Sequence, residues 1–411
     1  MRRAAVAIAA LVLAPAAGAW TTLGTGVLNT EVPGLLVTQS GTLLESFASN
    51  SGGTISVVRN GGAPKTVVTG DIAANRTQLV QQPNGAIQLY FPNPQGVGRM
   101  TSTDDGQTWT GPIQTQSHTL GPVNAAAVAP DGTPYFAQDG TGFVNVFRGL
   151  NGEQVKNVYT RCCGYFESLA VDTTGLAQVA FYSNADSDGA TVYEPLAADL
   201  TPTTPLLLKP VAEHDETPLV TDRSGNTFLA WAPGSPTATT LSVVPLRGGA
   251  PSGDGVSFKG PFTSPEPHMA LAVDAADRLW VVWTQGGKLH AARSRSHGVH
   301  FGATVTAAEP STVHMLAAVG IATGVGTVDV VVNTSSSLVQ QALKPGLSVR
   351  VTKKGKAHYA QALDDGFGVG GARFRIGGKT IKANAAGKAK VPSGRGVASA
   401  SGYVSASFRV P

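Results

Sequence analysis

Residues 102–109 read Ser102-Thr103-Asp104-Asp105-Gly106-Gln107-Thr108-Trp109. An aspartate carboxylate at this place can accept backbone N–H bonds, and a glycine supplies the positive φ that a tight turn needs. The closing tryptophan provides a large ring that can pack between two sheets. The stretch therefore predicts a hairpin turn with structural roles for Ser102, Asp104, Gly106, Thr108 and Trp109.

A degenerate copy of the same stretch occurs at residues 294–301, with serine in place of the aspartate and phenylalanine in place of the tryptophan. Both copies fall in the same part of a longer repeat: a short apolar run, a turn with Asp or Gly, and a second run rich in Val, Tyr, Phe, Trp and Thr. Such runs lack helical spacing and predict strands. The copies cover residues 35–44, 79–91, 126–136, 169–182, 219–231, 271–283 and, more weakly, 316–332. Their turns lie about 43 to 52 residues apart, which is typical of four-stranded propeller blades.

The two short motifs resemble the Asp-box, or BNR, motif of sialidase-like β-propellers. The resemblance implies an all-β fold in which residues 20–345 form a seven-bladed, or alternatively six-bladed, propeller. Asp-boxes mark the fold in that family and lie away from the catalytic centre, so they imply no activity. The seventh repeat lacks a clear fourth strand. We expect residues 20–28 to supply it, because closing the ring removes exposed sheet edges.

Composition favours a folded, turn-rich chain. Gly and Pro make up 76 of the 411 residues, about 18% against a usual 12%, which disfavours a helical bundle. A hydrophobic fraction of 42% beside 14% charged residues disfavours disorder.

The first nineteen residues have the pattern of a signal peptide. Met1-Arg2-Arg3 is a basic start, residues 4–14 are apolar, and Ala17-Gly18-Ala19 is a cleavage signal. No later apolar run approaches the length of a transmembrane helix. We therefore expect a secreted, extracellular bacterial protein.

The end of the chain differs in charge from the rest. Residues 348–411 hold twelve Lys and Arg but only two acids, Asp364 and Asp365, for a net charge of +10, whereas the remainder carries −6. Glycine-rich pieces such as 364–375 and 401–403 resemble bacterial Ig-like or carboxypeptidase-regulatory-like domains, which implies a small β-sandwich over 348–411. The charge predicts either contact with polyanionic envelope polymers or a plain solvated surface. Aromatic residues are sparse there, so no specific nucleic-acid recognition is expected.

A candidate ligand site emerges from one aligned position ahead of each inner strand. Successive repeats place there Arg76, Val123, Phe166, Glu216, His268 and His314, with Asn124, Glu167 and Asp215 adjacent. In the sialidase-like family, the ligand site lies where the inner strands begin. The row therefore predicts either a ligand pocket or ordinary solvated residues at the tunnel mouth. In a pocket, Arg76 would bind an anion, and Glu216, Glu167 or Asp215 would act as a general acid or base. His268 and His314 would donate hydrogen bonds or bind a metal ion.

The resemblance argues against the usual sialidase reaction. Sialidases of that family bind the substrate carboxylate with three arginines and contain an Arg-Ile-Pro motif near the start of the domain. This sequence has no Arg-Ile-Pro motif, and Arg76 is the only arginine at the aligned position ahead of the inner strands. We expect a non-catalytic monomer, without metal or cofactor, that binds a glycan or envelope polymer through Arg76, Asn124, Glu216, His268 and His314. The alternatives are an exo-sialidase-type glycoside hydrolase with diverged motifs and a scaffold for protein partners.

The only two cysteines, Cys162 and Cys163, are adjacent. In an exported protein they predict a vicinal disulfide, strained because neighbouring Cα atoms lie only ~3.8 Å apart. Two packed, reduced thiols are the alternative.

Overall fold

The computed structural model describes residues 19–411 apart from 29, 50–52, 71–75, 118–120, 141–142, 160–163, 186–188, 212–215, 235–236, 248–249, 254, 261, 263–267, 296–297 and 299. The described residues form thirty-seven β-strands and no helix, and hence none long and apolar enough to cross a membrane. Residues 1–18 of the predicted signal peptide and the predicted Cys162–Cys163 disulfide lie outside the described residues.

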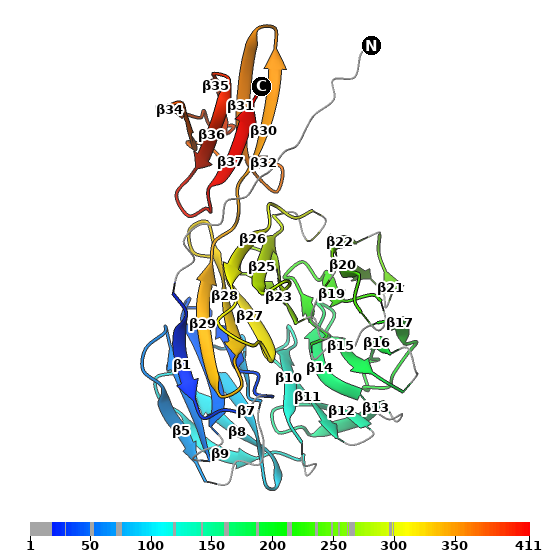
Figure 1. Ribbon diagram of the computed structural model, residues 1–411. Coiled ribbons are helices and arrows are strands. Elements are labelled where there is room, and N and C mark those ends of the chain that lie inside the picture. The colour runs from blue at the N-terminus through cyan, green and yellow to red at the C-terminus, as the bar shows by residue number, and fades with distance from the viewer. Residues whose placement is uncertain are drawn as a thin grey trace.

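Seven antiparallel sheets follow one another along most of the chain (Figure 1). The first consists of β2 (Gly34–Val37), β3 (Leu43–Ser49), β4 (Thr54–Arg59) and β5 (Lys65–Thr69). The second consists of β6 (Gln78–Gln81), β7 (Ile87–Asn93), β8 (Gly96–Ser102) and β9 (Thr110–Gln114). The third consists of β10 (Val123–Val128), β11 (Pro134–Gly140), β12 (Phe143–Arg148) and β13 (Gln154–Tyr159). The fourth consists of β14 (Gly164–Val171), β15 (Ala177–Ser183), β16 (Ala190–Pro195) and β17 (Leu206–Leu208).

The last three sheets include the strand that joins the two ends of the series. The fifth consists of β18 (Leu219–Thr221), β19 (Thr227–Trp231) and β20 (Thr240–Arg247), with β21 (Ala250–Pro251) and β22 (Val256–Lys259) both paired to β20. The sixth consists of β23 (Met269–Val273), β24 (Leu279–Thr284), β25 (Lys288–Arg293) and β26 (Val305–Ala308). The seventh consists of β27 (Met315–Ile321), β28 (Thr327–Asn333), β29 (Ser337–Leu343) and β1 (Thr21–Thr25). β1 pairs antiparallel with β29, so the segment 20–28 supplies the outer strand predicted for it.

The sheets form a closed ring. The first strand of each sheet contacts the first strand of the next, and β27 contacts β2 again. Buried apolar side chains fill each seam between neighbours; Leu44 and Ile55 of the first sheet, for example, pack against Ile87 and Leu89 of the second. Burying one such side chain contributes about 1.5–3 kcal/mol. The architecture is a β-propeller, and its inner strands all begin around one central opening.

The stretch 102–109 forms the turn between β8 and β9. The Ser102 hydroxyl accepts a hydrogen bond from the Gly106 N–H at 2.9 Å, and Asp104 accepts one from the Thr108 N–H at 2.8 Å. Hydrogen bonds from Thr108 lower the pKa of Asp104 to about 2. Gly106 has φ = 79°, which favours glycine. Trp109 packs on the apolar seam between the first two sheets, as its place in the motif predicts.

The second copy makes the same key contact despite its substitutions. The Ser294 hydroxyl accepts a hydrogen bond from the Gly298 N–H at 3.1 Å, and Gly298 has φ = 71°. Phe301 packs on the seam between the fifth and sixth sheets. The serine and glycine therefore hold this turn without the aspartate.

Residues 348–411, called here the C-terminal module, form two further sheets above the ring (Figure 1). One contains β30 (Ser348–Lys354), β31 (Ala357–Asp364), β32 (Phe367–Gly368) and β35 (Lys388–Val391). The other contains β34 (Lys379–Lys382), β33 (Arg373–Ile376), β36 (Gly394–Ser399) and β37 (Ala406–Val410), in that order. One apolar cluster that includes Ala360, Phe374 and Phe408 lies between them.

Candidate ligand pocket

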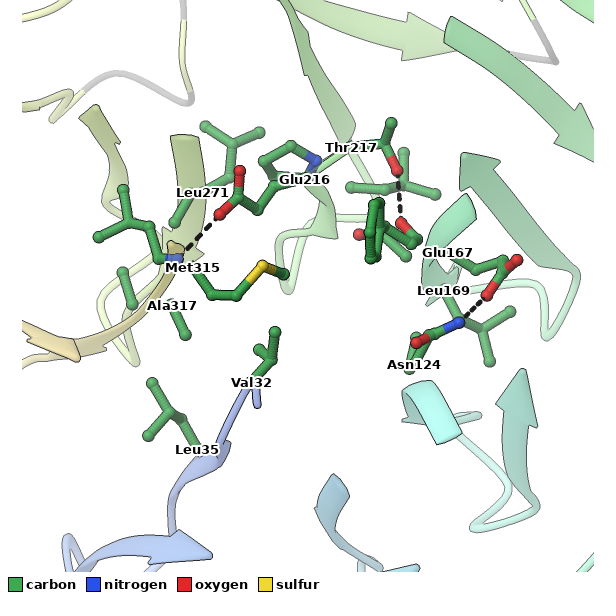
Figure 2. A pocket seen from close by; sticks show the side chains of 18 of the residues that line it. Val32, Leu35, Asn124, Glu167, Leu169, Glu216, Thr217, Leu271, Met315 and Ala317 are labelled. Atoms are coloured by element: carbon green, nitrogen blue, oxygen red, sulfur yellow. Dashed lines mark hydrogen bonds between the residues drawn. The ribbon is translucent and has the colours of Figure 1, made fainter. Parts of the chain in front are cut away.

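A cavity of about 290 Å³ lies where the inner strands begin. All seven of these strands, from β2 to β27, contribute residues to its lining, so the cavity lies on the axis of the ring. Its apolar lining includes Leu35, Leu169, Leu271 and Met315 (Figure 2). Polar side chains occupy two parts of the wall: Asn124 and Glu167 lie together, and Glu216 lies across the cavity from them (Figure 2).

Arg76 and Phe166 form one edge of this wall in an uncommon backbone conformation. Their φ angles are 76° and 58°, a left-handed region that costs a non-glycine residue on the order of 1–3 kcal/mol. The Arg76 guanidinium lies 4.3 Å from the centre of the Phe166 ring. Two strained residues in contact with each other at a cavity are typical of a functional site, where the fold holds side chains in a required position.

Hydrogen bonds link Arg76 to a carboxylate through an amide. Its Nη1 donates to Asn124 Oδ1 at 2.9 Å, and Asn124 Nδ2 donates to Glu167 Oε2. Arg76 is only 3% exposed, and its Nε donates to the Thr30 carbonyl at 3.2 Å. The guanidinium is therefore held largely out of solvent and positions Asn124, which contacts Glu167; all three residues belong to the lining of the cavity.

Glu216 and His268 form a carboxylate–imidazole pair on the opposite side. His268 Nδ1 lies 3.1 Å from Glu216 Oε1, and both residues are buried. The Leu316 N–H donates to the same carboxylate oxygen at 2.8 Å. A carboxylate in this position fixes the orientation of an imidazole, which is the geometry that proton transfer by histidine requires.

The structure brings together most, but not all, of the residues that the sequence singled out. Arg76, Asn124, Glu167 and Glu216 line the cavity, and His268 reaches it through Glu216. His314 instead places its Nε2 2.8 Å from the Ser335 hydroxyl and does not line the cavity. Asp215 lies outside the described residues. Among the residues that are described, no three His, Cys, Asp or Glu side chains gather as a metal site would require.

Three further residues of the site escaped the sequence analysis. Met269 and Met315 line the cavity, and their signal was their place directly after His268 and His314. Glu31 is fully buried and accepts hydrogen bonds from the N–H groups of Arg76 at 2.8 Å and Ala48 at 2.9 Å. Burial raises the pKa of Glu31 to about 7. Its contact with the Arg76 backbone helps to hold that strained residue in place.

Comparison with known proteins supports the fold. No protein-family model matches the sequence, and no curated protein matches it. Among solved structures, an inactive variant of virginiamycin B lyase from Staphylococcus aureus with quinupristin is similar at a TM-score of 0.52 and 13% identity, over 79% of this chain and 98% of that one. A streptogramin B lyase is similar at 0.51 and 11% identity, over 79% and 97%. A Hadza microbial sialidase has a TM-score of 0.41 and 13% identity, over 76% of this chain and 65% of that one. At these identities, the likeness to the two lyases supports the β-propeller fold alone.

Proposed function

We propose that this protein is secreted and that its central cavity binds a glycan or envelope polymer without cleaving it. In this proposal, residues 20–345 form a sialidase-like propeller of seven blades. Residues 348–411 form an Ig-like or carboxypeptidase-regulatory-like sandwich. The observation that carries the proposal is the lining of the cavity. Two carboxylates and an amide stand on two walls of a cavity whose lining also includes Gln78, Ser168, Thr217 and many apolar residues.

A chain of neutral sugars fits this lining. Hydroxyl groups can donate to Glu167 and Glu216 and pair with Asn124, while the C–H faces of a sugar ring can pack on Met315 and Leu271. A negatively charged sugar fits less well, because two carboxylates face the cavity and Arg76 is the one arginine among its described lining residues. The family's grip on a sialic acid carboxylate would need three guanidinium groups.

A second candidate function rests on the Glu216–His268 pair. An oriented imidazole beside a sugar could act as a general base, which would make the protein a hydrolase or lyase. The contacts described support binding more directly, because His268 and the Leu316 N–H hold the Glu216 carboxylate in place and Arg76 holds Asn124. A scaffold for protein partners would use the outer faces of the sheets and leave the cavity without a ligand.

Glu216→Gln is expected to weaken glycan binding about tenfold or more, because it removes a charged acceptor that hydroxyl groups would use. Affinity would be measured by calorimetry on the glycan that the wild-type protein binds best on an array. Glu153→Gln, which changes an exposed carboxylate between β12 and β13 that does not line the cavity, serves as the matched control.

Product analysis in the same samples separates the candidates. Release of a shortened glycan by the wild type, abolished in Glu216→Gln, would replace the binding proposal with an enzyme. Equal glycan affinity in the wild type and in Glu216→Gln would show that the glycan does not bind in the cavity.

A further inference from the structure

The C-terminal module presents no acidic side chain on its open surface. Its two acids, Asp364 and Asp365, are both buried where the module meets the ring. Asp364 binds Arg293 and the Tyr403 hydroxyl, and Asp365 accepts the Arg295 N–H at 2.8 Å. Twelve Lys and Arg residues therefore share the module with no exposed Asp or Glu.

The outer face of the β34–β33–β36–β37 sheet gathers five of these cations. Along each strand the inward side chains, such as Phe374 and Phe408, are buried, and the alternate side chains point outward. The exposed cations on this outer face are Arg373, Arg375, Lys382, Arg395 and Arg409. None of them forms an ion pair with any described residue of the chain.

The register places like charges directly opposite each other. Arg395 pairs with Arg409 across β36 and β37, and Arg373 pairs with Lys382 across β33 and β34. Cations in directly opposed positions repel, because their Cβ atoms lie only about 4.5–5.5 Å apart. Since no described ion pair includes these cations, an external polyanion that supplies negative charge would stabilise both pairs.

We propose that this arginine-rich face binds a linear polysaccharide that carries carboxylate or sulfate groups. Four of the five cations are arginines, whose planar guanidinium binds such groups through two parallel hydrogen bonds. No aromatic ring stands among the outward side chains to stack on nucleic-acid bases. Val397, 40% exposed, is the one large apolar side chain there, which is too little to insert into a membrane. This surface is separate from the cavity of the ring.

The other sheet of the module provides a matched control. Its outer face carries Arg350, Lys388 and Lys390, and Lys388 lies 5.1 Å from the centre of the Tyr359 ring. The variant Arg373→Gln/Arg375→Gln/Arg395→Gln and the control Arg350→Gln/Lys388→Gln/Lys390→Gln each remove three exposed positive charges. The two variants lose the same number of charges from opposite faces; the first loses three arginines, and the control loses one arginine and two lysines.

Binding of the full chain to polygalacturonate, which is carboxylated, and to dextran sulfate would be measured by biolayer interferometry, with neutral dextran as the blank. Circular dichroism would verify that each variant folds. We expect the wild type to bind at least one of the charged polymers, the first variant to lose at least tenfold in affinity, and the control to lose less than threefold. The binding constant should fall with added salt.

Three results would overturn the assignment: no binding of either charged polymer by the wild type, equal losses in both triple variants, or tighter binding of poly(dT) or of anionic phosphatidylglycerol vesicles than of both polysaccharides. The first result would show that the protein does not bind these anionic polysaccharides. The second would show that binding does not depend on the arginine-rich face. The third would show that the partner is a nucleic acid or a membrane.

Discussion

Asp364→Ala is expected to destabilise the protein by about 3–5 kcal/mol, which is the usual cost of removing one partner from a buried ion pair. Arg293, at the end of β25, and Asp364, at the end of β31, are 2% and 1% exposed by side chain. The substitution leaves the Arg293 charge buried and deprives the Tyr403 hydroxyl of its acceptor. Urea denaturation of the full chain, followed by tryptophan fluorescence, measures the loss.

Two comparisons identify the cause of that loss. Arg59→Ala breaks a half-exposed pair with Asp105, and we expect it to cost at most about 1 kcal/mol. The double variant Asp364→Leu/Arg293→Met replaces both charges with apolar groups and should regain most of the stability. If Asp364→Ala lowers the free energy of unfolding no more than Arg59→Ala does, the buried pair does not stabilise the contact between the C-terminal module and the ring.

The second large effect concerns pH and the seam between the first and seventh sheets. Glu45 of β3 is fully buried, and neither of its carboxyl oxygens has a hydrogen-bond partner among the described residues. Burial, aided by the negative charge of Asp329 in β28, raises the pKa of Glu45 from 4.5 to about 8. Burial also raises the pKa of Asp329. The folded state therefore holds a proton that the unfolded chain releases above pH 4.5.

The contribution of Glu45 to stability should consequently fall by about 1.4 kcal/mol per pH unit between pH 4.5 and 8 and then level off, because in that window the folded state holds a proton on this carboxyl and the unfolded state does not. Glu45→Gln removes this contribution and leaves those of other buried carboxyls with raised pKa values, such as Glu31. We expect the variant to match the wild type near pH 4.5 and to exceed its stability on the order of 4 kcal/mol at pH 8. Urea denaturation at a series of pH values measures the difference.

A control for Glu45 is available at the surface. Glu153→Gln changes an exposed carboxylate, and its stability profile should follow that of the wild type at every pH. A constant difference between Glu45→Gln and the wild type across the range would contradict the proposed protonation of Glu45.

Local sequence signals predicted the strands and turns well. The repeat of an apolar run, a turn and a second β-rich run located most inner strands, and the similar stretches 102–109 and 294–301 predicted the turns at Ser102 and Ser294. The unpaired end of the seventh repeat predicted β1 as its outer strand. These features depend on neighbours in sequence, so a repeat alignment can reveal them.

Features that depend on side-chain direction could not be predicted in this way. His268 and His314 occupy the same aligned position, yet one meets Glu216 and the other meets Ser335. The covered position of Arg76 depends on its positive φ and on Phe166 from a sheet two places further along. The outer strands, such as β5 and β13, are largely exposed and carry too little apolar periodicity to be located from sequence.

The central claim is that the cavity of the ring binds a glycan, and methionine methyl groups can test it directly. Met269 and Met315 line the cavity, whereas Met100 is buried between the first two sheets. In a protein labelled with ¹³C-methyl methionine, addition of the glycan that binds best on the array should shift the Met269 and Met315 signals and leave Met100 unchanged. Binding of that glycan, measured by calorimetry, with no shift of Met269 or Met315 would contradict the claim.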